Sequence, residues 1–107
     1  MAGKGKGKMA IAEVTVIPIG TGSTSLSSYV AHMQRVLSGL EGISYELTSM
    51  STIIEGPLDR IFAAITALHE APFHEGAQRV STSVKIDDRR DKAGSSEQKL
   101  RSVREKL

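Results

Sequence analysis

The alternation of apolar and polar positions predicts four β-strands along this chain. The segments are residues 10–19, 43–49, 52–55 and 79–87, and they are rich in branched side chains that pack well on a pleated sheet. In the first segment one face carries Ala12, Val14 and Val16, and the other carries Ile11, Glu13, Thr15, Ile17 and Ile19. Neither face is fully polar, so we expect a central strand that is covered at least partly on both sides.

Apolar residues at spacings of three and four predict two long helices. The first covers residues 25–40, and its apolar stripe comprises Leu26, Tyr29, Val30, Met33, Leu37 and Leu40. Thr24 or Ser25 is its expected N-cap and Gly42 its expected end. The second helix begins at Pro57, and its expected buried stripe comprises Leu58, Ile61, Phe62, Ile65, Leu68 and His69. Pro72 predicts a kink or break before Gly76, because a proline removes a backbone hydrogen bond from a helix.

A third, shorter helix is expected to start at Ser95. Its only apolar residues are Leu100, Val103 and Leu107. So thin a stripe rarely stabilises a short helix on its own subunit. We therefore expect residues 93–107 to pack on a neighbouring subunit or to fray.

These elements follow the order β-α-β-β-α-β, with an additional C-terminal helix. Two right-handed crossovers around one hairpin give an α+β, ferredoxin-like fold, in which an antiparallel sheet has both long helices on one face. Residues 10–92 form this predicted domain, and residues 1–9 a leader of Gly and Lys with a composition typical of disorder. The open face is expected to carry Glu13, Thr15, Ile17, Ile19, Glu46, Thr48, Ser81, Ser83 and Lys85. This mixture predicts an oligomer interface, a ligand surface, or both.

The charge balance changes once the leader is set aside. The chain has fourteen basic and twelve acidic residues, and Lys4, Lys6 and Lys8 belong to the leader, which leaves eleven basic residues against twelve acidic ones. The body is therefore slightly acidic and has few aromatic residues, so we do not expect it to bind nucleic acid. There is no cysteine and no apolar run near the roughly 20 residues that span a bilayer. We expect a soluble, cytoplasmic protein with no membrane partner.

Motifs for metal or cofactor chemistry are weak. His69 and His74 are five residues apart, whereas a helical zinc motif needs a spacing of four, so a structural role is favoured for both and for His32. The Gly20–Ser25 segment, GTGSTS, lacks the lysine of a phosphate loop; it is either a capped turn or a small polar ligand site, and the turn is favoured. No metal and no cofactor are expected.

Two carboxylates lie in or beside the predicted sheet. The structural interpretation pairs Glu13 with Lys85 across the sheet and places Glu55 near the start of the second helix. The chemical interpretation makes either carboxylate a ligand-binding group or a general base. For each residue alone, the structural interpretation is favoured.

Taken together, three segments resemble the thiamine-binding ferredoxin-like family of small proteins. The segments are AEVTVIPIGTGSTSLSSYV at residues 12–30, YELTSMSTIIEG at residues 45–56 and RVSTSVKIDDRRD at residues 79–91. The resemblance implies subunits that form dimers through their sheets, commonly assembled into tetramers. It also implies binding of thiamine or its hydroxymethylpyrimidine part, without a known reaction.

The resemblance also implies a set of site residues. It assigns ligand binding to the hydroxyls of Thr15, Ser28 and Thr52 and the carboxylate of Glu55, with Ile17, Ile19 and Ile54 as apolar walls. An aminopyrimidine has a donor and acceptor edge that a carboxylate and a hydroxyl satisfy between aliphatic walls.

The predicted function is a non-enzymatic small-molecule binding protein that acts in buffering, delivery or sensing. One alternative is a small-metabolite enzyme of the dimeric ferredoxin-like barrel type, with Glu13 or Glu55 as general base. Another is a structural or partner-binding module, which the fold alone does not exclude.

Overall fold

A computed structural model of the chain describes residues 9–91 and 96–107. Its elements, in chain order, are β1 (Met9–Pro18), α2 (Ser27–Ser38), β2 (Ser44–Leu47), β3 (Thr52–Pro57), α3 (Leu58–His74), β4 (Val80–Asp87) and α4 (Ser96–Lys106). Of the predicted leader, only Met9 is described, and it begins β1. None of the helices in these two ranges is long and apolar enough to cross a membrane.

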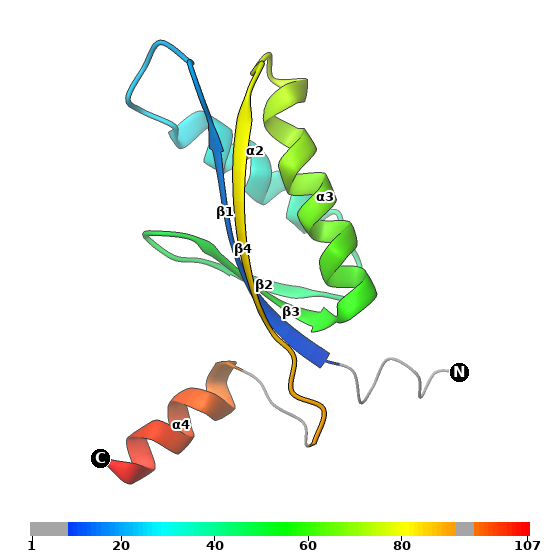
Figure 1. The fold of residues 1–107 in the computed structure, drawn as a ribbon, viewed down its shortest axis with the longest axis vertical. Helices are drawn as coiled ribbons and strands as arrows, with labels where there is room; N and C mark the ends of the chain where they lie inside the picture. The colour runs from blue at the N-terminus through cyan, green and yellow to red at the C-terminus, as the bar shows by residue number, and fades with distance from the viewer. Residues whose placement is uncertain (1–8, 92–95) are drawn as a thin grey trace.

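The four strands form one antiparallel sheet in the order β2-β3-β1-β4 (Figure 1). The hydrophobic central strand is β1, as its two partly apolar faces predicted. The ferredoxin-like α+β fold is thus confirmed, with α4 as the additional C-terminal helix. β3 pairs with β1 only from Met9 to Val14, so β1 and β4 extend together beyond the β2–β3 hairpin.

The core lies between the sheet and the two long helices. Small residues of β1 and α3, among them Ala10, Ala12, Ala64 and Ala71, let this helix approach the sheet closely, and Leu37, Ile54, Ile61 and Leu68 fill the space around them. α3 lies against β1, β3 and β4, and α2 packs mainly on α3. The opposite face of the sheet is not covered by either long helix and is called the open face below.

The boundaries of α2 differ from the prediction. Its N-cap is Leu26, which makes no side-chain cap bond, and its C-cap is Gly39 rather than Gly42. The hydroxyl of Ser25, one of the two expected caps, lies 3.4 Å from the hydroxyl of Ser27. In the preceding loop Thr21 Oγ1 donates to the carbonyl of Ser23 at 3.0 Å, and the Ser23 hydroxyl accepts from the Ser25 N–H at 3.1 Å. A turn therefore precedes α2, but the predicted cap is wrong because local loop bonds compete with capping.

α3 differs from the prediction in its first residue, in the absence of a break at Pro72 and in the exposure of Phe62. Pro57 ends β3 in an extended conformation and α3 begins one residue later. The helix continues through Pro72 to His74 without the expected break, since Pro72 lies in its last turns and is itself buried. Phe62 was expected in the buried stripe but is 52% exposed, because the neighbouring Ile61 occupies the position that faces the core.

Candidate functional site

The residues predicted to bind ligand lie on both sides of the sheet. The open face carries four of them: Thr15, Ile17, Ile19 and Glu55. Thr52 and Ile54 lie on the helix-covered face, and Ser28 is exposed in the first turn of α2. A small molecule on one face of a sheet does not contact side chains on the other, so these seven residues do not form one site.

Thr52 and Ile54 have structural surroundings. Ile54 is fully buried in the core, and Thr52 is 8% exposed. The amide Nε2 of Gln34 donates a hydrogen bond of 3.2 Å to Thr52 Oγ1 and so links α2 to β3. This bond satisfies a buried hydroxyl, which is costly to leave unpaired. Both residues therefore act beneath the sheet rather than on the open face.

The four open-face residues are also spread along the strands. Glu55 pairs with Ile11, and Thr15 lies four positions further along β1. At about 3.3 Å per residue, Glu55 and Thr15 are separated by roughly 13 Å along the sheet. Glu55 therefore belongs to a different part of the open face than Ile17 and Ile19.

Around Glu55 the register brings four carboxylates together. One row across the strands is Glu46, Ile53, Glu13 and Lys85, and the adjacent row is Ser44, Glu55, Ile11 and Asp87. We call these eight residues the acidic half of the open face. The four carboxylates are accompanied by two ammonium groups, Lys85 beside Glu13 and Lys99 of α4 on Asp87, so the net charge of this half is negative and attracts cations.

Within the acidic half, Glu13 is held in place by two neighbours. The hydroxyl of Ser51 donates to Glu13 Oε2 at 2.9 Å, and Lys85 Nζ lies 4.0 Å from Glu13 Oε1. The predicted cross-strand pairing of Glu13 and Lys85 is confirmed. Glu13 and Glu55 are diagonal neighbours on adjacent strands, about 7–8 Å apart at the backbone.

Ile11 and Ile53 fill the alternate positions between these carboxylates. Ile11 is directly opposite Glu55, and Ile53 is directly opposite Glu13. These alternating positions present two carboxylates and two aliphatic side chains together, a combination that can contact both a charged and an apolar part of a small ligand.

Ile11, Ile53 and Ser51 were not among the predicted site residues. The alternation of side chains along β3 would have identified Ile53. Because Glu55 lies on the open face, Ile53, two positions earlier, shares that face and the adjacent Ile54 does not. Ser51 lies far from Glu13 in sequence, and its contact depends on the β2–β3 turn. The sequence alone gave no signal for that contact.

The remainder of the open face has a different character. Thr15 and Ile17 of β1 lie beside Ser83 and Ser81 of β4, Ile19 follows the end of β1, and we call these five residues the neutral half. Ile17 is 44% exposed and Ile19 is 39% exposed. Ile17 lies opposite Ser81, and the N–H of Ile19 donates to the carbonyl of Arg79, so one charged residue borders this half at its end. Two exposed isoleucines mark this half as a surface that is stabilised by further burial.

The histidines contact residues of neighbouring elements. His69 Nδ1 is 2.7 Å from Thr82 Oγ1, so the ring bridges α3 and β4, and its edge packs against Phe73. His32 Nδ1 lies 3.9 Å from a carboxylate oxygen of Glu75, a contact between α2 and α3 that the sequence spacing did not predict. In residues 9–91 and 96–107, no group of three or more His, Cys, Asp or Glu side chains is arranged to hold a metal ion.

Comparison with known proteins identifies relatives of this chain. The family described as thiamine-binding protein matches residues 12–104. The UPF0045 protein YqgV of Bacillus subtilis is 53% identical over 92% of this chain and 98% of its own length. A UPF0045 protein of Methanothermobacter thermautotrophicus is 48% identical over 92% of this chain and all of its own length.

A solved structure supports the fold. The crystal structure of the hypothetical protein MJ1052 from Methanocaldococcus jannaschii superimposes with a TM-score of 0.80 at 36% identity, over 91% of this chain and 97% of that chain. The match covers the strands that build both halves of the open face.

Proposed function

The chain belongs to the thiamine-binding protein family, and from this we propose that it is a non-enzymatic binding protein for thiamine or its hydroxymethylpyrimidine moiety. The observation that carries the proposal is the family match over residues 12–104, which includes every strand of the sheet. The proposed role is buffering, delivery or sensing of this ligand in the cytoplasm.

We place the ligand on the acidic half of the open face. The carboxylate of Glu55 accepts from the amino group of the pyrimidine, and Ile11 and Ile53 provide aliphatic contacts to the ring. Glu13, positioned by Ser51, lies near the cationic thiazolium. Thr15 is the next open-face residue after Glu13 and offers a hydroxyl at the border of the site. With no aromatic side chain in the site to stack on the ring, the affinity is modest.

We propose that the neutral half forms a dimer interface with a second copy of the chain. This half is only two strands wide, and a two-stranded ribbon is marginally stable unless its faces are covered. Its exposed isoleucines gain from burial, whereas the acidic half would bring like charges together in the same contact. Leu100 of α4 and Leu107, directly after it, are also exposed, and their burial between dimers gives a tetramer.

The enzymatic alternative uses Glu13 or Glu55 as a general base. Glu13 already accepts a hydrogen bond from Ser51 and lies beside Lys85, an arrangement that fixes the carboxylate on the sheet. In residues 9–91 and 96–107, the histidines lie in the helices on the covered side, so neither carboxylate has an imidazole on its own face. The geometry therefore favours binding.

Calorimetric titration with thiamine, hydroxymethylpyrimidine and thiamine pyrophosphate tests the proposal. We expect saturable binding of the first two. Glu55→Gln should lower the affinity for both ligands by about tenfold, because it removes a charge-assisted hydrogen bond. Glu13→Gln should weaken thiamine more than the uncharged pyrimidine, since it removes a charge that faces the thiazolium.

The matched control is Glu70→Gln, which removes an exposed carboxylate from α3 on the other side of the sheet. It should leave both affinities unchanged. Absence of saturable heat with all three ligands at several temperatures would reject the function. Equal affinity of the wild type and Glu55→Gln would remove Glu55 from the site.

A further inference from the structure

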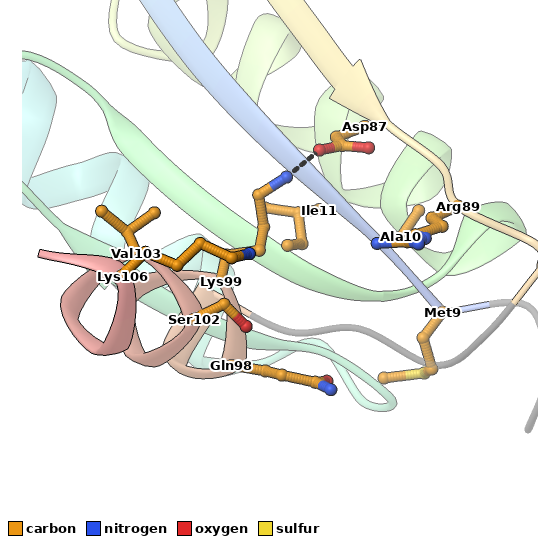
Figure 2. A pocket seen from close by; sticks show the side chains of 10 residues that line it. All are labelled: Met9, Ala10, Ile11, Asp87, Arg89, Gln98, Lys99, Ser102, Val103 and Lys106. Carbon is orange, nitrogen blue, oxygen red and sulfur yellow. Dashed lines mark hydrogen bonds and ion pairs between the residues drawn. The ribbon is translucent and has the colours of Figure 1, made fainter.

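A cavity of about 400 Å³ lies between α4 and the ends of β1 and β4 (Figure 2). Its lining comprises Met9, Ala10, Ile11, Asp87, Arg89, Gln98, Lys99, Ser102, Val103 and Lys106. The volume is in the range that proteins use for small organic ligands. The cavity adjoins the acidic half at Ile11 and Asp87, but its other walls have the opposite charge.

One face of α4 supplies most of the polar lining. Lys99, Ser102, Val103 and Lys106 recur at spacings of three and four, so they lie along the same side of the helix. Arg101 and Arg104, on the same helix, do not line the cavity. The cavity therefore receives two of the lysines of α4 and neither of its arginines.

The charges of the lining favour an anion. Arg89, Lys99 and Lys106 are cationic, Asp87 is the one carboxylate among the lining residues, and the carboxylate of Asp91 pairs with Arg89, so three cations are accompanied by two carboxylates. Lys99 reaches from α4 to Asp87 and forms an ion pair that fixes the helix against the end of β4 (Figure 2). Within residues 9–91 and 96–107, Lys106 has no ion-pair partner.

Arg89 retains hydrogen-bonding capacity for a ligand. Its Nε and Nη2 donate to the two carboxylate oxygens of Asp91 at 2.6 and 3.1 Å, and the hydrogen bond and charge of Asp91 raise the pKa of Arg89 above its usual value. The guanidinium has five N–H donors, of which Asp91 engages one on each of these nitrogens. The remaining N–H groups are available to a further acceptor at the cavity wall.

We propose that this cavity binds a small phosphate monoester, with the phosphate between Lys106, Arg89 and Lys99 and the organic part against Met9, Ala10 and Val103. Donors supplied by α4 and by the segment that follows β4 suit an anion with several oxygen atoms better than a planar carboxylate. Ser102 and Gln98 add uncharged polar groups to the α4 wall, where Gln98 extends toward Met9 (Figure 2). The proposal does not rest on thiamine binding at the acidic half.

Titration of the full chain with inorganic phosphate at low ionic strength tests the proposal, followed by the amide NMR signals of β1, β4 and α4. We expect saturable binding that shifts signals around Met9–Ile11 and Lys99–Lys106. Lys106→Gln and Arg89→Gln should each weaken it by about fivefold, as expected for partly exposed charges. The control Arg104→Gln removes a charge from the same helix outside the cavity and should leave the affinity unchanged.

Absence of saturable binding by the wild type would overturn the proposal. An equal loss of phosphate affinity in Arg104→Gln would also overturn the proposal, because the loss would then follow from the overall charge of α4 rather than from the cavity. A second arm separates two sources of the phosphate group. If saturating phosphate weakens the binding of thiamine monophosphate but not that of thiamine, one phosphorylated ligand spans the cavity and the acidic half. If it weakens the binding of neither ligand, the cavity takes a separate phosphate monoester.

Discussion

The acidic and neutral halves of the open face share β1 and β4 but differ in width and chemistry. The acidic half is four strands wide and places two aliphatic side chains between four carboxylates. The neutral half is two strands wide and combines hydroxyls with exposed isoleucines. A broad charged surface suits a small organic cation, whereas a narrow uncharged one suits a second copy of the same surface.

The difference arises from the register of a single strand. β3 pairs with β1 from Met9 to Val14, so the carboxylates of β2 and β3 accompany only the first part of β1. Beyond Val14 the strand has β4 as its partner, and Ser83 and Ser81 lie opposite Thr15 and Ile17. One face of one sheet is thereby divided into a proposed ligand site and a proposed subunit interface.

The largest expected effect is on the neutral half. Ile17→Asp should raise the dissociation constant of the dimer at least about 100-fold, because each copy loses an apolar contact worth about 1.5–3 kcal/mol and gains a buried charge. Analytical ultracentrifugation across a concentration series measures this change. Phe62→Asp, at an exposed position of α3, is the control and should leave the dimer intact. A wild-type chain that stays monomeric at micromolar concentration would contradict the interface.

A second pair of variants separates the two faces of β3. Ile54→Ala should lower the free energy of unfolding by about 2–5 kcal/mol, because Ile54 is fully buried in the core. The neighbouring Ile53→Ala should cost about 1 kcal/mol or less and should weaken thiamine binding instead. Urea denaturation and calorimetry of both variants provide the two readings. The reverse result, with ligand binding lost in folded Ile54→Ala and retained in Ile53→Ala, would place the site under the sheet.

The smallest expected effect comes from the ammonium group of the acidic half. Lys85→Gln should strengthen thiamine binding about twofold, because Lys85 opposes the cation but is highly exposed and 4.0 Å from Glu13. Hydroxymethylpyrimidine serves as the uncharged control ligand and should bind equally to both proteins. Weaker thiamine binding by the variant would show that Lys85 positions Glu13 rather than competing with the ligand.

The fold and both faces of β1 could be predicted from the sequence. Strict alternation in Ala12, Val14 and Val16 assigns the covered face, and two amphipathic helices that flank one hairpin define the topology. The same alternation also predicts the Glu13–Lys85 pair, which the structure contains. These features follow from local periodicity, which the chain carries at every strand.

The candidate site was harder to predict from the sequence, because several of its predicted residues are close in sequence but not in space. Thr52, Ile54 and Glu55 lie within four consecutive positions of one strand, where side chains point alternately to opposite faces. Ser51 reaches Glu13 because it directly precedes β3, which pairs with β1, and the hydroxyls of Thr21 and Ser23 before α2 bond within their own loop. Such contacts depend on tertiary geometry and have no periodic signal.

Amide NMR of the isotopically labelled protein during a thiamine titration tests the central claim most directly. The account predicts the largest shifts at Ile11, Glu13, Ile53 and Glu55, with little change at Ile17 and Ser81. Shifts concentrated at Thr52 and Gln34, beneath the sheet, or at Ile17 and Ser81, in the neutral half, would contradict the assignment of the acidic half as the ligand site.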